Sequence, residues 1–154
     1  MTYLTDEDIN SLAKDPKAFL AQAYHIERLI GVKKRRIEHL RQLSVQITQT
    51  IKPVTVFTGP GDKIANSVIE ITDLTRELNE DIARLLDLQR KAAEAIAEFV
   101  PDRTQRAVLE ARYLAGMSWE DIAYTFRYAY RWVLRLHKKA LAAMQANAAK
   151  EGEE

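Results

Sequence analysis

The sequence predicts an all-α protein in which a long antiparallel, coiled-coil-like helical hairpin precedes a C-terminal helix-turn-helix domain. Apolar residues recur at helical spacing over 16–51 and again over 63–99. Capping residues precede every expected helix except the last. The 154 residues include only five Gly and four Pro, and most of these fall at expected boundaries. We therefore expect the hairpin over 1–100 with a loop at 52–63, the helix-turn-helix domain over 101–146, and a flexible tail over 147–154.

Composition narrows the class of protein. The chain has no cysteine, which excludes disulfides and thiolate metal sites and fits a reducing compartment. No long uncharged apolar run occurs, so we expect no membrane span, no secretory signal and a cytoplasmic location. The histidines, His25, His39 and His137, form no paired metal-ligand motif, and no nucleophile elbow or Gly-rich cofactor turn is present. We therefore expect that the chain is not an enzyme and that it binds no metal, cofactor or small-molecule substrate.

Two helix starts open the chain. Thr5 with Asp8 three residues later predicts a capping box and a short helix that ends near Lys14. Asp15 before Pro16 predicts the start of a long helix. Its coiled-coil seam consists of Ile26, Ile30, Ile37, Leu40, Ile47 and Ile51, with Lys33 and Ser44 as polar interruptions.

A basic run, Lys33 to Arg36, lies within this first long helix. Such a run is typical of a solvated helix face. The functional alternative is a second phosphate contact or a contact with an acidic surface, and both interpretations stay open.

Residues 52–63 interrupt the helical pattern. Pro53 and the β-branched residues after it cannot continue a helix, and the segment 58–61 (Thr-Gly-Pro-Gly) marks a turn. We expect Asp62 to cap the next helix. The Gly-Pro-Gly-Asp-Lys string lacks the Walker spacing and a Ser or Thr after the Lys, so it predicts no nucleotide site.

From Lys63 to Phe99 the pattern is a heptad repeat. A helix this long must bury its seam, and the first long helix is the expected antiparallel partner. Leu74, Leu86 and Leu88 lie outside the strict seam and widen the apolar face. We expect a second copy of the chain or the C-terminal domain to cover that face, and hence a homodimer, with packing against another protein as the alternative. The seam positions are Ile64, Ile71, Leu78, Leu85, Ala92 and Phe99, with Val68, Thr75, Ile82, Gln89 and Ile96 as companions.

Three further helices are expected after residue 100. Asp102 after Pro101 predicts a start, and Gly116 predicts the end of that helix. Ser118, followed three residues later by Asp121, predicts the next start. The apolar positions expected in the core of this domain are Trp119, Ile122, Phe126, Val133 and Leu136.

The last helix, from about Tyr130, has a cationic face opposite its apolar stripe. A helix that presents Arg from its first turns, braced by a shorter helix, can enter the DNA major groove, where Arg donors reach guanine edges. Arg127 and Lys139 are expected phosphate contacts. Trp132 could either pack or contact a thymine methyl group. The expected DNA contacts are Arg127, Tyr130, Arg131, Leu134, Arg135, Lys138 and Lys139.

A family resemblance is carried by the series Arg106, Val108, Leu109, Arg112-Tyr113-Leu114, Gly116, Ser118-Trp119-Glu120-Asp121-Ile122-Ala123, Phe126, Val133 and Arg135-Leu136-His137. This series resembles the C-terminal promoter-binding domain, region four, of bacterial sigma factors. It is still more similar to the sigma-like domain of the ArpU and RinA group of phage late-gene transcription activators. The central segment extends the similarity through Gly61 to Asn66, Ile71 to Leu74, and Glu77 to Asn79.

The resemblance implies a sequence-specific regulator that binds double-stranded DNA at phage or prophage late genes in a bacterial cell. RNA polymerase is a further candidate partner, because sigma-like domains also contact it. Two alternatives stay open: a DNA-packaging subunit like the small terminase, and a helical protein-interaction adaptor or polymerase cofactor with no DNA readout.

Two positions depart from the family pattern. Arg127 stands where such domains usually place Gly in the turn, so Arg127 must adopt a positive φ or the turn must change shape. Ala129 stands where Ser or Thr usually precedes the recognition helix, and alanine offers no cap, which is worth about 1 kcal/mol.

Overall fold

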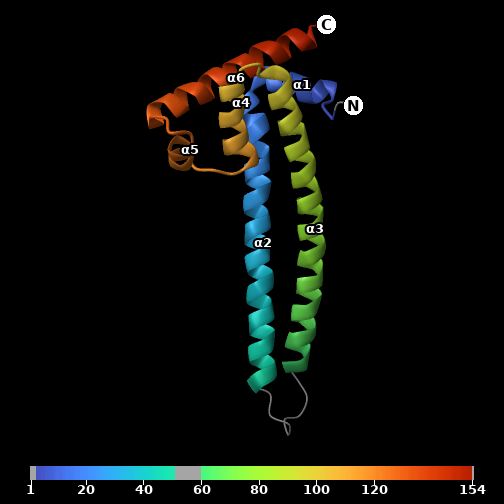
Figure 1. Ribbon diagram of the computed structural model, residues 1–154. Coiled ribbons are helices and arrows are strands. Elements are labelled where there is room, and N and C mark those ends of the chain that lie inside the picture. Colours follow the sequence, from blue (N-terminus) through green and yellow to red (C-terminus); the bar gives the residue numbers. More distant parts are fainter. Residues whose placement is uncertain (1–2, 51–59, 154) are drawn as a thin grey trace. The chain divides into compact units, whose positions relative to one another are not determined.

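The computed structural model describes residues 3–50 and 60–153 (Figure 1). Over these residues the chain is helical and contains no strand, so the predicted all-α class is confirmed. None of the described helices has the length and apolar character needed to cross a membrane. The elements are α1 (Asp6–Lys14), α2 (Pro16–Thr50), α3 (Pro60–Phe99), α4 (Arg103–Leu109), the π-helical turn η1 (Glu110–Leu114), α5 (Trp119–Phe126) and α6 (Tyr130–Gly152).

Two compact units make up the chain. The central unit is Ile26–Arg84, and the terminal unit combines Met1–His25 with Leu85–Glu154. This grouping differs from the expected division into 1–100, 101–146 and 147–154. The difference arises because α1, the start of α2 and the end of α3 share a core with the C-terminal helices.

The predicted helix starts are present with their side-chain caps. The Thr5 hydroxyl accepts the Asp8 N–H at 3.2 Å, and the Asp8 carboxylate accepts the Thr5 N–H at 2.9 Å, which is a capping box. Asp15 accepts the Ala18 N–H at 3.1 Å. Asp102 likewise accepts the N–H of Gln105 at 2.9 Å. Local sequence therefore determines where these helices begin.

Two boundaries differ from the expectation. Helix α3 begins at Pro60, so Asp62 lies inside its first turn and is not its N-cap residue. Proline is well suited to a first helical position, because it has no N–H to leave unpaired there. The remainder of the expected loop, and Ile51 of the seam, lie outside the described residues. After Leu109 the backbone widens into η1, which the sequence pattern did not predict.

The terminal unit is built around a core that joins the chain's early and late segments. Leu12 of α1, Leu20 of α2 and Ile96 of α3 are fully buried in it together with Met144 of α6. Side-chain hydrogen bonds reinforce this packing: the Asn147 amide donates to the carbonyl of Phe99 at 2.8 Å. Burying each large apolar side chain stabilises the fold by about 1.5–3 kcal/mol.

The expected flexible tail at 147–154 is instead largely helical. Helix α6 continues through Gly152, and Ala148 is fully buried in the terminal core. The Gln145 amide donates to the carbonyls of Ala13 and Lys14 at 3.1 and 3.3 Å. Two alanines of α6, Ala140 and Ala148, are among the small residues buried in this core together with Leu12 of α1.

Ion pairs join α2 to α3 in the central unit. Lys33 pairs with Asp81 and with Glu77, the latter at 3.7 Å, and Arg36 pairs with Glu70 at 2.9 Å. The partner's number falls as the number on α2 rises, so these two helical segments run in opposite directions (Figure 1). Half of the basic run Lys33–Arg36 is therefore occupied by α3 carboxylates, which supports its interpretation as a structural face.

The apolar seam of the central unit is largely the expected one, since Ile64, Ile71 and Leu78 of α3 are partly buried. Ile26, Ile30 and Ile37 of α2 are buried, as the seam predicts. On α3, however, Leu74 is buried and Val68 is 54% exposed, although Val68 was the expected companion position. Leu74 lies on the same side of α3 as Glu70, Glu77 and Asp81, the carboxylates of the ion pairs, at steps of three and four residues. The side chain of Ile47 lies outside the described residues.

Candidate nucleic-acid interface

The connection between α5 and α6 is set by backbone hydrogen bonds around Arg127. Arg127 has φ 57° and ψ 42°, the left-handed conformation, so of the two expected outcomes the positive φ is the one observed. Its N–H bonds to the carbonyl of Tyr124 at 3.3 Å, and the N–H of Tyr128 bonds to that of Ala123 at 3.0 Å. This pair of bonds is a Schellman motif, which usually has glycine at the left-handed position.

Helix α6 begins without a side-chain cap. Ala129 is its N-cap residue and makes no side-chain hydrogen bond, as its methyl group requires. Only the carbonyl of Ala129 closes the first turn, accepting from the N–H groups of Trp132 and Val133 at 2.9 and 3.1 Å. By contrast, α5 begins at a capped position, where the Ser118 hydroxyl accepts the N–H of Asp121 at 3.1 Å.

A separate apolar cluster packs between α4, η1, α5 and α6. The predicted core residues Ile122, Val133 and Leu136 are buried in it, and Trp119 and Phe126 pack partly buried against it. The remaining members come from α4, from η1, from the segment before α5 and from α5 itself; they are Val108, Ala111, Met117 and Ala123. All five residues assigned to this core from the sequence thus lie in the same cluster.

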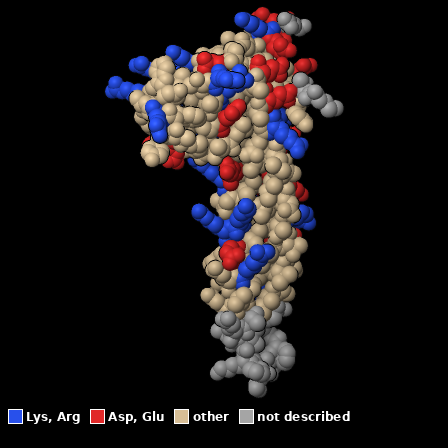
Figure 2. All heavy atoms as spheres, viewed as in Figure 1, with Lys and Arg blue, Asp and Glu red and all other residues tan. Residues whose placement is uncertain are grey.

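The predicted DNA contacts lie on the outward face of α6 and on the turn before it. Arg131, Arg135 and Lys138 recur at steps of four and three residues, opposite the buried Val133 and Leu136. In Figure 2, Lys and Arg side chains project from the part of the terminal unit where α6 begins. All seven predicted positions are solvent-exposed: Arg127, Tyr130, Arg131, Leu134, Arg135, Lys138 and Lys139.

The charge on this face is of one sign. No Asp or Glu occurs between Asp121 and Glu151, whereas six Lys and Arg residues do. None of the ion pairs in the described part of the chain involves a cation of α6 or its preceding turn. The free cations therefore present an uncompensated positive potential, which anionic partners would neutralise.

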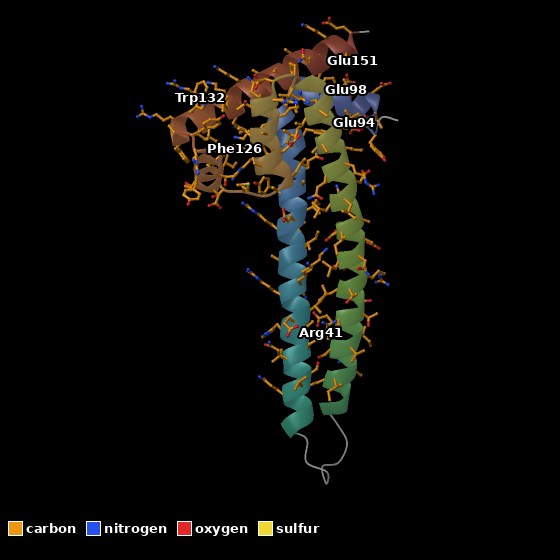
Figure 3. The ribbon with its side chains drawn as sticks, viewed as in Figure 1. Arg41, Glu94, Glu98, Phe126, Trp132 and Glu151 are labelled. Atoms are coloured by element: carbon orange, nitrogen blue, oxygen red, sulfur yellow. The ribbon has the colours of Figure 1, made fainter. Side chains whose placement is uncertain are left out.

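Trp132 lies at the surface, 40% exposed, on the first turns of α6 (Figure 3). The ammonium group of Lys139 lies 5.2 Å from the centre of its indole ring. The sequence left Trp132 with two possible roles, packing in the core or facing outward, and the structure places it outside the core. The cation–π contact restricts the Lys139 side chain beside the cationic stripe.

Two residues near this interface were not singled out as functional from the sequence. The hydroxyl of Tyr113 lies 2.8 Å from Nε2 of the buried His137, and burial lowers the pKa of His137 to about 4. Burial also raises the pKa of Tyr113 to about 12. The available signal was spacing: His137 follows Val133 by four residues and precedes Ala140 by three, which places it at the edge of the buried face.

The described residues contain no group of three or more His, Asp or Glu side chains able to hold a metal ion. No protein-family model, curated protein or solved structure matches the chain. The chemical character of the interface therefore rests on its own residues: an exposed helix face with cations in two successive turns, mounted on a fixed apolar cluster.

Proposed function

We propose that this chain is a sequence-specific double-stranded DNA-binding transcription regulator, of the phage or prophage late-gene activator type, and not an enzyme. In the proposed architecture, α4, η1, α5 and α6 form a sigma-like helix-turn-helix domain, and α2 and α3 form a helical hairpin that dimerises or docks. α6 enters the major groove. Arg131 and Arg135 contact base edges, and Arg127 and Lys139 contact phosphates.

The observation that carries the proposal is the outward face of α6. Its Arg131, Arg135 and Lys138 side chains are exposed, lie on one stripe and have no carboxylate partner in the described part of the chain. Guanidinium groups on a helix in the major groove can donate two hydrogen bonds to guanine O6 and N7. The resemblance of the segment from Arg106 to His137 to sigma factor region four supports the same use of α6.

Dimerisation is the second part of the proposal. Several apolar side chains in the central unit are more than half exposed. The sequence also predicted an apolar face on α3 that is wider than one partner helix can cover. Covering such side chains with a second copy would remove them from water. The exposed apolar residues concerned are Val32, Val45, Val68 and Ile69.

The decisive experiment is selection from random-sequence duplexes with the full chain at about 150 mM salt, where nonspecific phosphate binding is weak. Enrichment of one sequence motif is expected, and an inverted repeat would indicate a dimer. Failure to enrich any motif would contradict the proposal.

Substitutions on α6 test the assigned contacts. Arg131→Ala and Arg135→Ala are each expected to weaken specific binding by about 1–3 kcal/mol, because each removes a bidentate base contact. Lys150→Ala is the matched control: it removes an exposed cation from the same helix, far from its first turns. Titrations of the selected duplex at fixed salt measure the effect. Equal affinities for Arg131→Ala, Arg135→Ala and Lys150→Ala would rule out the base contacts.

The exposed apolar residues of the central unit also favour a second candidate, a helical adaptor that binds protein and not DNA. If no duplex is enriched, direct binding to purified RNA polymerase is the next measurement, because the sigma-like domains that the chain resembles also contact RNA polymerase. A ring-sized oligomer in solution would instead favour the DNA-packaging alternative.

A further inference from the structure

Five side chains behind the cationic face form a closed ring of contacts, here called the contact ring. Each member contacts the next, and the last contacts the first. The ring draws one residue from each of α2, α5 and α6 and two from η1. Its members, in order, are Tyr24, Arg112, Trp119, His137 and Tyr113.

Arg112 lies between two aromatic rings. Its guanidinium carbon is 5.1 Å from the centre of the Tyr24 ring and 4.4 Å from that of Trp119. Nη1 of Arg112 donates to the carbonyl of Met117 at 3.0 Å, in the segment that leads into α5. The Tyr24 hydroxyl donates to the carbonyl of Arg112. One side chain thus connects η1 with α2, with the segment before α5 and with the first residue of α5.

The other half of the ring reaches α6. The rings of Trp119 and His137 meet edge to face, 4.5 Å apart. His137 also stacks on Tyr113 at 5.7 Å and shares the 2.8 Å hydrogen bond with the hydroxyl of that residue. Tyr113 then meets Tyr24 edge to face at 6.0 Å. His137 lies between Leu136 of the core and Lys138 of the cationic face, so fixing its ring restricts rotation of α6 about its own axis.

We infer that Arg112 is a positioning residue for the proposed DNA-binding face: through Trp119 and His137 it sets the rotation of α6 and thereby the direction in which Arg131 and Arg135 point. This inference rests on the proposed function. A bidentate contact needs its donors held within roughly 0.5 Å and 10–20° of the correct geometry. Because α6 lacks a side-chain cap at Ala129, its first turn is held only by backbone bonds and by the buried Val133. The contact ring adds a second constraint, through His137, on the rotation of α6.

Binding by Arg112→Met provides the main test. This variant keeps a side chain of similar length but removes the charge and the hydrogen bond to Met117. We expect the ratio of affinity for the selected duplex to affinity for a scrambled duplex to fall about tenfold, the size of one partly exposed cation–π contact together with one hydrogen bond. Affinity for the scrambled duplex should change by less than about twofold, because the phosphate-contacting cations remain.

A mutant cycle separates positioning from general stability. If Arg112 acts through Arg135, the double variant Arg112→Met, Arg135→Ala loses less specific affinity than the product of the two single losses. Arg103→Met is the matched control, since Arg103 is an exposed arginine one helix earlier in the chain. It should leave the ratio unchanged. The inference is overturned if the double variant loses specific affinity equal to the product of the two single losses. It is also overturned if the affinity ratio is unchanged in Arg112→Met.

A measurement without DNA keeps this test distinct from the proposed function. The ring-proton resonances of His137 report the orientation of Trp119, which lies 4.5 Å away. They should shift in Arg112→Met and stay in place in Arg103→Met. If the wild-type chain selects no duplex, the proposed function fails, and unmoved His137 resonances in Arg112→Met would overturn the positioning of α6 as well.

If Arg112→Met does not fold, Tyr24→Phe is the second variant, because it removes only the hydroxyl that bonds to the Arg112 carbonyl. We expect a smaller fall in the affinity ratio and a smaller shift of the His137 resonances. No change in either quantity overturns the inference.

Discussion

At the residue scale, Arg127 combines an unfavourable backbone conformation with a useful charge. It is the one described residue other than glycine with a positive φ, in a Schellman motif where glycine would cost less. The side chain is exposed and belongs to the cationic face. Its presence at this position is consistent with a contribution to binding that offsets a cost in stability.

Replacing Arg127 by glycine should separate these two effects. We expect Arg127→Gly to raise the free energy of unfolding by up to about 1 kcal/mol, because glycine adopts the left-handed region without a steric penalty. Under the proposed function, the same variant should bind duplex DNA more weakly, since the proposed phosphate contact of Arg127 is lost. Denaturant unfolding and a binding titration measure the two changes. A variant that loses stability would contradict the assigned strain.

His137 predicts a pH dependence of stability. Its pKa is about 4 in the folded chain, against an ordinary value of 6.5, because burial disfavours the charged ring. Above pH 6.5 both states are neutral and the shift has no effect. As pH falls from 6.5 to 4, the unfolded chain binds a proton that the folded chain does not, so folding should lose about 3 kcal/mol in this window.

The difference between the wild-type curve and that of His137→Gln, measured by denaturant unfolding from pH 7.5 to 4, isolates this contribution. Contributions from groups other than His137 are common to both curves and cancel. A flat difference curve over this range would show that the His137 ring is not buried as described.

At the scale of the element, a side-chain cap at the start of α6 should stabilise the chain. Ala129 already has the extended backbone of an N-cap residue, with φ −62° and ψ 142°. In Ala129→Ser the hydroxyl would accept the N–H of Arg131 or Trp132, and the free energy of unfolding should rise by about 1 kcal/mol. Ser118→Ala at the start of α5 is the reciprocal control and should cost about the same amount. Equal stability of all three proteins would contradict the importance of these caps.

Helix starts were predictable from sequence because a cap is a local interaction. Thr5, Asp102 and Ser118 each bond to an N–H three residues away, so the partners are visible in a short window. The π-helical turn η1 has no such signature. Its widening is held by the bonds from the Ala115 N–H to the Glu110 carbonyl and from the Met117 N–H to the Ala111 carbonyl, and Arg112 within it contacts residues far away in the chain. Periodicity placed most of the apolar face of α3 correctly: Ile64, Ile71 and Leu78 are partly buried, and only the expected companion Val68 is more than half exposed among the described seam positions.

At the scale of the whole molecule, sequence patterns identified buried faces but not their partners. The stripe on α6 that predicted Val133 and Leu136 as core is correct, and the cationic positions are exposed as expected. The packing of α1 on the second half of α6 was not predicted, because nothing local distinguishes a stripe that faces α5 from one that faces a helix more than a hundred residues away.

This packing predicts that the C-terminal helices do not fold alone. A fragment of residues 101–154 would lose the fully buried Leu12, Leu20 and Ile96, which pack in one core with Met144. Each such loss costs about 1.5–3 kcal/mol, and the sum approaches the whole stability of a small domain. Circular dichroism during thermal unfolding should show no cooperative transition for the fragment and a clear one for the full chain. A cooperative transition in the fragment would restore 101–146 as an independent domain.

The contact between α1 and α6 also bears on how the chain is made. Gln145 bonds to the carbonyls of Ala13 and Lys14, 132 and 131 positions earlier. At ribosomal rates of about 5–20 residues per second, α1 emerges on the order of ten seconds before its partner exists. The central unit, whose ion pairs span 34 to 48 positions, has its partners available earlier. Leu12 must therefore wait until the end of synthesis for Met144 and the other α6 members of its core, so the terminal unit completes its core only when the last helix has been made.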